Sequence, residues 1–416
     1  MPLDLVLRQA RLVERGKDLV DIGIEAGRIV DVSPRIAADA PEEQLDGRLV
    51  IPGFVETHIH LDKSCILDRR AEHGTLQEAI AAVAAAKRAF TEEDIYARAR
   101  RTLEKAIVQG TTRMRTHVEI DPRIGLKGFQ AVRQLKHDYE WAIDLQICVF
   151  PQEGLTNDPG SEDLLITACE QDADVIGGCP YTDTDPQTQI ARIFEIARRF
   201  DLDIDFHLDF DIDPSWMHLD DVCRQTDAHR WGGRVAIGHV TKLSAIDHSR
   251  LAVIGRRLAD AGVAVTVLPA TDLFLMGREH GHHVPRGVAP AHRLLDHGVT
   301  CSLATNNVLN PFTPFGDCSL LRMANLYANI AQAGRRSELQ ACLDMVTTLP
   351  ARLMNAADYG IAVGHQADLV VLDSRDPAMA VAELAQPLFG LKRGRRSFTR
   401  HAAMIHHPAR TRACET

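Results

Sequence analysis

Two histidines, His58 and His60, stand one residue apart just after an apolar run that begins at Val50. Side chains alternate between the two faces of a β-strand, so these imidazoles point the same way, about 7 Å apart along the strand. Neutral imidazole is a common ligand for zinc, iron and other first-row metals. The pair therefore suggests a metal site, although structural histidines at a strand end have the same spacing.

Further polar side chains follow other short apolar runs. They are His117, Gln152, His207, His239, Asn306 and Asn307. If these runs are parallel strands of one barrel, their carboxyl ends meet at one mouth. The histidines at positions 58, 60, 207 and 239 then converge and leave positions open for water and substrate. The sequence predicts a metal centre with a single ion at that mouth.

The elements that must position these residues alternate along the middle of the chain, where helical patterns separate the apolar runs. The predicted strands are 50–60, 112–118, 145–150, 175–178, 204–210, 235–239, 263–268 and 299–304. Strands that alternate with helices form right-handed βα units with a parallel sheet. Eight such units fit a (β/α)8 barrel, whose reactive residues lie at the carboxyl ends of the strands.

Short strands separated by turn signals occupy the N-terminal segment, and strand-like runs return after residue 361. We predict an α/β protein whose main part, residues 53–357, is a distorted (β/α)8 TIM barrel. Residues 1–52 and 358–416 are predicted to build one small β-sandwich together, followed by a tail. The basic stretch 392–396 lies in this last part, and we expect it to be a solvated loop.

Composition narrows the function classes. The chain has 416 residues, 45% of them hydrophobic, and a formal net charge of −10 with no large basic cluster. This balance argues against nucleic acid or an anionic membrane as the main partner. No apolar stretch reaches transmembrane length and no secretory segment is recognisable. The nine cysteines form no CxxC pair, so we expect reduced thiols and a cytoplasmic location.

The run 52–62, Pro-Gly-Phe-Val-Glu-Thr-His-Ile-His-Leu-Asp, together with His207 and His239, resembles the amidohydrolase superfamily. Within it, the chain is similar to the bacterial cytosine deaminase group and to N-isopropylammelide isopropylamidohydrolase. Further matching strings extend the resemblance over nearly the full length. They lie at 116–118, 145–147, 150–154, 275–278, 310–312 and 358–362.

The resemblance implies roles for individual residues. His58, His60 and His207 hold one divalent ion, zinc or iron, and Asn306 occupies a fourth ligand position. His239 ligates the ion or hydrogen-bonds its hydroxide. Lys63 matches a lysine of the isopropylamidohydrolase site, and Gln152 contacts a cyclic substrate. We also expect Asp183 and Asn307 to bind substrate, and relatives of this architecture are often homo-oligomers.

The chemistry explains why these residue types are needed. A divalent ion lowers the pKa of a bound water to about 7, and the hydroxide attacks an sp² carbon that bears an amino or alkylamino group. A cation or an imidazole beside that carbon stabilises the developing negative charge, a role that suits Lys63 and His239. The alternative for Lys63 is a salt bridge to Asp62 or Glu56.

Two positions depart from the family pattern. The glutamate that carries protons in cytosine deaminases is replaced by Phe210, and the metal-binding aspartate is replaced by Asn306. A neutral amide is a weaker ligand than a carboxylate and cannot act as a base. Asp209, in phase with His207, is the candidate replacement base, with a helix N-cap or a loop carboxylate as the alternative. Phe210 either stacks on a planar substrate ring or only packs.

Two hypotheses remain open. The leading one is a metal-dependent hydrolase that cleaves a C–N bond of a small cyclic amide, amidine or aminated N-heterocycle. The alternative is a catalytically silent or metal-poor barrel that binds a heterocyclic ligand, because both acidic positions are lost. The loop 277–287, with three histidines and three glycines, is either a lid over the pocket or a solvated loop.

Overall fold

An eight-stranded parallel sheet forms the centre of the protein in the computed structural model, which describes residues 3–69, 74–401 and 403–406. Its strands follow one another in chain order, each hydrogen-bonded to the next. They are β6 (Phe54–Ile59), β7 (Thr111–Glu119), β8 (Asp144–Phe150), β9 (Val175–Gly178), β10 (Asp203–Leu208), β11 (Val235–His239), β12 (Val263–Val267) and β13 (Cys301–Leu303). A bridge between Ile59 and Asn306 brings the first and last strands together, so the predicted barrel is confirmed.

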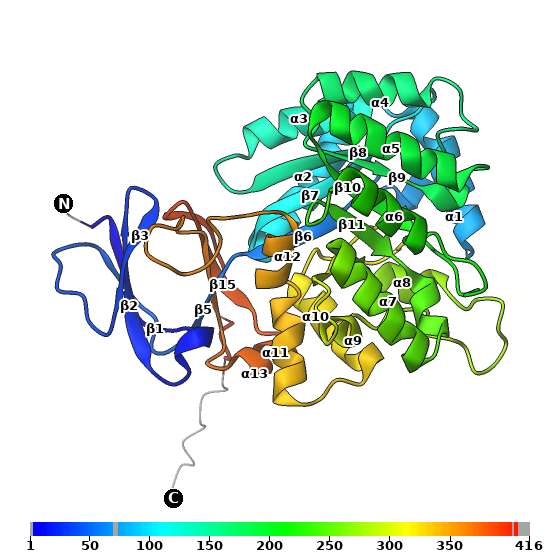
Figure 1. Cartoon of the computed structure of the whole chain (residues 1–416). Coiled ribbons are helices and arrows are strands. Elements are labelled where there is room, and N and C mark those ends of the chain that lie inside the picture. Colours follow the sequence, from blue (N-terminus) through cyan, green and yellow to red (C-terminus); the bar gives the residue numbers. More distant parts are fainter. Residues whose placement is uncertain (1–2, 70–73, 402, 407–416) are drawn as a thin grey trace, which may run out of the picture.

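Helices cover the outside of this barrel (Figure 1). They are α1 (Leu76–Ala86), α2 (Glu92–Val108), α3 (Lys127–Asp138), α4 (Ser161–Glu170), α5 (Pro186–Phe200), α6 (Leu219–His229), α7 (His248–Ala261), α8 (Pro269–Leu275), α9 (Ala291–Leu295), α10 (Leu320–Ala331), α11 (Arg336–Asp344), α12 (Thr348–Leu353) and α13 (Pro377–Ala382). Among the described residues, no helix combines the length and the apolar character needed to cross a bilayer.

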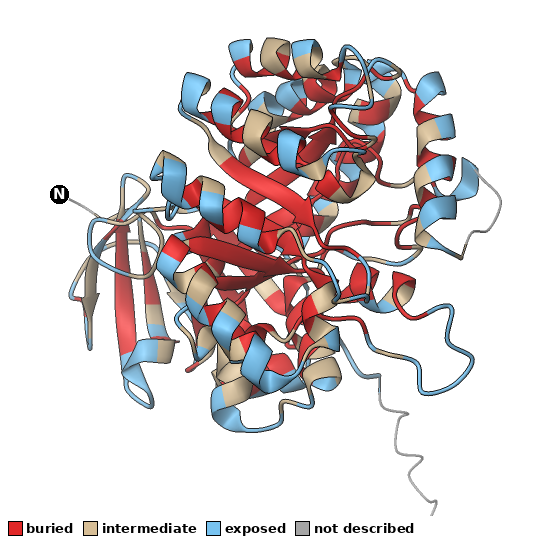
Figure 2. Cartoon of the chain, turned by 45° about the vertical axis from the view of Figure 1, so that its right-hand side comes forward, coloured by how far each residue is buried: buried red, intermediate tan, exposed pale blue. Residues whose placement is uncertain are grey.

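Helix α5 illustrates how local sequence fixes these elements. It begins at Pro186 after the cap residue Asp185, whose carboxylate accepts the N–H of Thr188. Its buried residues Ile190, Ile193, Phe194 and Ala197 recur every three or four positions, as on one face of a helix. The strands that these helices cover are buried on both faces (Figure 2), as is usual in a parallel sheet.

The first barrel strand differs from its prediction. Residues 50–60 were expected to form one strand, but β5 (Leu49–Pro52) belongs to another sheet and β6 begins at Phe54. The break falls at Gly53, where a Cβ atom would lie only 2.2 Å from side-chain atoms of Thr112. Only glycine allows the chain to pass this close to β7 and change sheets.

The two ends of the chain share that second sheet. Its order is β16-β15-β14-β5-β1-β2-β3, with β4 beside β1. The remaining strands are β1 (Leu5–Arg11), β2 (Leu19–Glu25), β3 (Arg28–Ser33), β4 (Glu42–Gln44), β14 (Leu369–Leu372), β15 (Pro387–Lys392) and β16 (Arg395–Thr399). Because β14 pairs antiparallel with β5, the expected β-sandwich takes the form of one mixed sheet, seen at the left of Figure 1.

The basic stretch 392–396 is not a solvated loop. It forms the turn between β15 and β16, and Lys392 is buried. The Lys392 ammonium donates hydrogen bonds to Asp144 at 2.7 Å, to Asp368 at 2.6 Å and to the carbonyl oxygen of Thr112 at 3.2 Å. Asp144 and Thr112 belong to barrel strands, so this cation ties the second sheet to the barrel, together with Arg393, whose guanidinium bonds Asp144 at 2.5 Å.

We predict that Lys392→Ala destabilises the protein strongly. The substitution removes the ammonium that pairs with the buried carboxylate of Asp368 and the half-buried carboxylate of Asp144, and breaking a buried ion pair typically costs about 3–5 kcal/mol of unfolding free energy. Urea denaturation of the two proteins measures the difference. Arg395→Ala, which removes an exposed cation from the same turn, is the control and should change stability by no more than about 0.5 kcal/mol. An equal loss in both variants would contradict the role assigned to Lys392.

Candidate active site

Three histidines converge where the carboxyl ends of β6 and β10 meet. The Nε2 atom of His207 lies 3.0 Å from Nε2 of His58 and 3.1 Å from Nε2 of His60. All three side chains are at most 2% exposed. Three ring nitrogens from two strands therefore face one common point inside the barrel mouth.

These imidazoles are suited to bind a cation. Burial holds the pKa of His58, His60 and His207 well below the ordinary value, and nearby positive groups, Lys63 among them, lower it further. Neutral imidazole is the form that binds metal ions. The opposite ring nitrogens, the three Nδ1 atoms, have no hydrogen-bond partner among the described residues. The donor set thus fits one divalent ion.

Asn306 completes this side of the site. Its backbone N–H donates to the carbonyl oxygen of His58 at 2.8 Å, and its carbonyl oxygen accepts the N–H of His60 at 2.9 Å. Its φ of 63° lies in the left-handed region, which asparagine tolerates better than most residues. The buried Oδ1 atom of its amide has no partner among the described residues. An unpaired buried oxygen beside three histidines is what a fourth ligand position would present.

A fourth buried ring, His117, lies against the cluster. It stacks on His58 with ring centroids 3.7 Å apart. His58, His117 and His207 also offer nitrogen atoms within 4.8 Å of one another. Asp205 lies 3.5 Å from Nε2 of His117 and pairs with Arg115 at 2.9 Å. The sequence placed His117 at a strand end but gave no reason to include it in the metal site.

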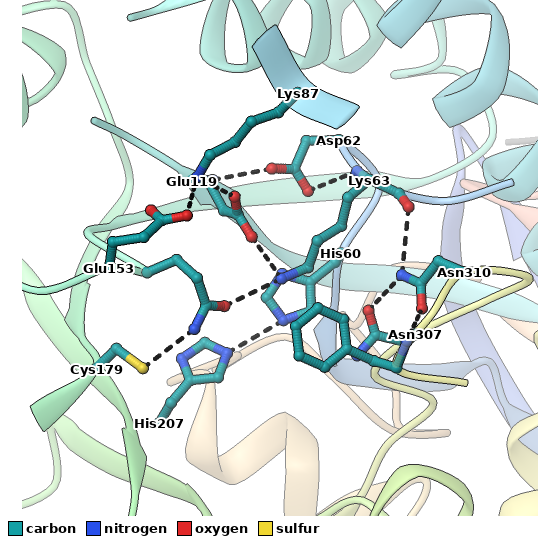
Figure 3. Close-up of polar contacts among 12 residues, drawn as sticks. His60, Asp62, Lys63, Lys87, Glu119, Glu153, Cys179, His207, Asn307 and Asn310 are labelled. Carbon is teal, nitrogen blue, oxygen red and sulfur yellow. Dashed lines mark hydrogen bonds and ion pairs between the residues drawn. The ribbon is translucent and has the colours of Figure 1, made fainter. Parts of the chain in front are cut away.

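Lys63 lies beside the histidines, but with an unexpected partner. Its ammonium donates to Glu119 at 2.7 Å and to Oε1 of Gln152 at 3.1 Å (Figure 3). It also sits over the ring of Phe312, 4.6 Å from the centroid. The salt bridge therefore forms with Glu119 at the end of β7, and neither Asp62 nor Glu56, the two acids considered from sequence, makes it.

Those two acids hold backbone amides instead. The carboxylate of Asp62 accepts the N–H groups of Lys63 and Glu119, both at 2.9 Å. The carboxylate of Glu56 accepts the N–H of His58 at 3.1 Å and also bonds Thr305. Burial raises the pKa of Glu56 to about 7. Both acids fix the backbone around the histidines.

A second lysine extends the charged network. Lys87, in the short helical turn after α1, donates to Glu119 at 2.9 Å and to Glu153 at 2.5 Å (Figure 3). It also donates to Asp121 at 2.5 Å. Although burial alone raises the pKa of Glu119, Lys63 and Lys87 hold it at about 2. The three acids around Lys87 also have the spacing of a metal site, but the ammonium already lies among them. No sequence motif pointed to Lys87.

His239 makes a pair that the sequence did not reveal. Its Nδ1 atom lies 2.7 Å from Oδ1 of Asp272, which is fully buried in α8. The ring of Phe210 packs against His239 with centroids 3.7 Å apart. Asp272 lies inside a helix rather than at the end of an apolar run, so the pattern that found the histidines could not find it.

Two other predicted residues are engaged elsewhere. The carboxylate of Asp209 accepts the N–H groups of His218 at 2.9 Å and Leu219 at 3.2 Å, at the start of α6. The N-cap residue of α6 is His218, so Asp209 serves as a loop carboxylate that holds the first amides of the helix. The carboxylate of Asp183 accepts the N–H of Leu155 at 2.6 Å and Nε2 of Gln189 at 2.6 Å, so it joins the segments after β8 and β9.

The remaining predicted positions border the site. Gln152 also donates from Nε2 to the Sγ atom of Cys179 at 3.3 Å, and Asn307 accepts a bond from Asn310 at 2.6 Å (Figure 3). In the loop 277–287, the three histidines are exposed, which agrees with the solvated alternative. The beginning of that loop, Gly277 to Glu279, borders one cavity, and its end, Pro285 to Gly287, borders another.

Comparisons with known proteins agree with this geometry. Residues 141–396 match the family described as "Amidohydrolase family". The chain is 28% identical to N-isopropylammelide isopropyl amidohydrolase of Pseudomonas sp. (strain ADP) over 94% of its own length and 96% of that protein. It is 31% identical to pterin deaminase of Rhizobium rhizogenes, over 85% of this chain and 82% of that one.

Solved structures give the same picture. The structure of 5-methylcytosine deaminase from Klebsiella pneumoniae with 5-fluorocytosine has a TM-score of 0.93 and 30% identity, covering 97% of this chain and 100% of that one. N-isopropylammelide isopropylaminohydrolase from Burkholderia multivorans has a TM-score of 0.84 and 28% identity, covering 95% and 98%. The fold is therefore shared almost from end to end.

We predict that Asn306→Asp increases the affinity for a divalent metal by about tenfold or more, because a carboxylate is a stronger ligand than a neutral amide. Competition with a chromophoric chelator measures the dissociation constant. Asn307→Asp is the matched control, since the amide of Asn307 bonds Asn310 and not the histidine cluster. Unchanged affinity in the Asn306 variant would show that this side chain does not face the ion.

Proposed function

The chain belongs to the amidohydrolase family and is a hydrolase that acts on carbon–nitrogen bonds, and from this premise we propose that it uses one zinc or iron ion to hydrolyse an aminated N-heterocycle. The bond cleaved joins a ring carbon to an exocyclic nitrogen. The observation that carries the proposal is the convergence of three Nε2 atoms. Those of His58 and His60 lie 3.0 Å and 3.1 Å from that of His207. The names of the relatives reported above contain heterocyclic compounds of this kind: N-isopropylammelide, pterin and 5-methylcytosine.

His58, His60 and His207 would hold the ion, with the amide oxygen of Asn306 beside them. A divalent ion in this place supplies Lewis acidity that lowers the pKa of a nearby water to about 7. The burial of the site strengthens every electrostatic interaction in it, because little solvent screens the charges.

His239 and Asp272 would move the proton. In the overall reaction, water adds to the ring carbon, the C–N bond breaks, and one proton of the water leaves on the amine. With Nδ1 committed to Asp272, His239 has only Nε2 free to accept that proton and return it to the leaving nitrogen. Asp272 positions the ring and fixes its tautomer. This assignment gives to His239 the role for which Asp209 was considered.

Lys63 would stabilise the negative charge that develops on the ring during attack. Glu119 holds its ammonium in place, and Gln152 presents an amide next to it for orienting the substrate. Phe210 and Asn307 would form further parts of the pocket, while the bonds of Asp183 favour a supporting role in the loops. A homo-oligomer remains a prediction by analogy.

The main support for a hydrolase over a silent or metal-poor barrel is the condition of the histidines. The rings of His58, His60 and His207 are buried, and their surroundings favour the neutral form. His239 is buried too, and Asp272 holds its ring in place. A barrel that had lost catalysis would have no reason to keep such a costly set of unpaired polar groups buried.

We predict that the purified protein contains about one equivalent of zinc or iron, and that His58→Ala loses both the metal and the turnover, by at least about 100-fold. Metal analysis and an ammonia or amine release assay on N-isopropylammelide, pterin and 5-methylcytosine provide the measurements. His280→Ala, in the exposed loop, is the control and should retain both. Full turnover by a metal-free protein would refute the proposal.

We also predict that Asp272→Asn lowers kcat by about 10- to 100-fold, because the asparagine amide no longer fixes the tautomer of His239. KM and metal content should stay close to those of the parent, and the pH profile of kcat should shift. Asp296→Asn, at an exposed position, is the control. A change in KM or metal content alone would instead assign Asp272 a structural role.

A further inference from the structure

A cavity of about 440 Å³ lies at the barrel mouth, outside the histidine cluster. Its walls come from the start of α1, from the segments after β9 and β10, and from the end of α8. Six apolar side chains line it: Leu76, Tyr181, Phe210, Ile212, Leu275 and Met276. The volume falls within the range of small-molecule sites, which is roughly 300–1,000 Å³.

The apolar wall is continuous with the packing around the proposed catalytic groups. The six side chains belong to one hydrophobic cluster, which also contains Phe312. Phe312 lies under the ammonium of Lys63, and Phe210 packs on His239. A ligand in the cavity would therefore touch the same cluster of side chains that surrounds the reacting centre.

Phe210 separates the cavity from the centre. Its side chain borders the cavity on one side and contacts His239 on the other, and it is only 3% exposed. Tyr181 meets it edge-on, with centroids 5.7 Å apart. A glutamate at this position would present a charge to the cavity, whereas the phenyl ring presents an apolar face.

We propose that this cavity is a second subsite, which takes an apolar alkyl or aryl substituent of the heterocycle while the ring lies at the histidine cluster. The inference deepens the proposed function and rests on it. Charge selects little here, because Arg278 and Glu279, of opposite sign, are both exposed at the rim. The third charged lining residue, Asp211, pairs with Lys242 at 3.1 Å. The guanidinium of Arg278 lies over Phe274, 4.4 Å from the ring centroid. Burial of apolar surface is the interaction that the wall offers.

Two homologous series of substrates test the subsite with the full-length, metal-replete protein. In N4-alkylcytosines the alkyl group is on the leaving nitrogen, and in 5-alkylcytosines it is on the ring. In each series the alkyl group is lengthened from methyl to butyl. We expect kcat/KM to rise roughly fourfold per methylene in one series, the gain from burying each CH₂ group. The responding series shows where the substituent is attached. A flat response in both series overturns the inference.

A matched pair of variants locates the effect. Ile212→Asp places a charge on the half-buried cavity wall and should reduce the gain per methylene to nearly none. Ile246→Asp makes the same change at a half-buried isoleucine that lines a different cavity, between α7 and α9, and should leave the gain intact. Equal gains per methylene in the two variants would show that the alkyl chain of the substrate binds outside this cavity.

Binding of inert analogues separates this inference from the proposed function. In 4-alkylpyrimidin-2-ones a carbon replaces the leaving nitrogen, and 5-alkyluracils carry no exocyclic amine, so calorimetry measures affinity without turnover. Affinity that rises with chain length, in a protein that hydrolyses none of the cytosines, supports the subsite and contradicts the hydrolase. Turnover of cytosines with no dependence on chain length, in kinetics or binding, supports the hydrolase and contradicts the subsite.

Discussion

The burial of neutral imidazoles at the closure of the barrel is the constraint on which the rest of the structure depends. The backbone bonds between Asn306 and both His58 and His60 join the last strand to the first, so the contact that closes the sheet also assembles the ligands. Neutral imidazoles whose Nε2 atoms are held about 3 Å apart are expensive to bury, and a protein gains from them only when something binds at that point. The same backbone bonds therefore close the barrel and position the histidines, so a change that weakens the closure also separates the ligands.

A second constraint is the placement of charge beside this neutral cluster. Two lysines, Lys63 and Lys87, lie next to it with three acids, and each of these five charges has an opposite partner within hydrogen-bond distance. Paired in this way, the charges avoid most of the cost of desolvation, whereas any one of them alone would be strongly unfavourable. The network holds the Lys63 side chain close to the histidines, where its field favours the neutral form of His60.

The replacement of two acids changes the character of the site more than its architecture. Phe210 removes a carboxylate and supplies a dry surface, and the pairing of His239 with Asp272 offers another route for a proton. Sequence phase suggested Asp209 as the substitute because it lies two residues after His207. In the structure a φ of 50° turns the chain at Asp209, and α6 takes its carboxylate. The alternation of side chains predicts their direction only within a strand, and β10 ends at Leu208, before Asp209.

The sequence by itself predicted the barrel and a smaller β-domain shared by the two ends of the chain, and it placed His58, His60, His207 and His239 at strand ends. These follow from periodicity, because apolar runs must be buried and strand ends must meet. Only the tertiary structure decided which charges pair: Glu119 rather than Asp62 with Lys63, Lys87 among three acids, and Asp272 with His239. Such partners come from distant helices and strands, and their choice depends on side-chain distances of a few ångströms that no local pattern encodes.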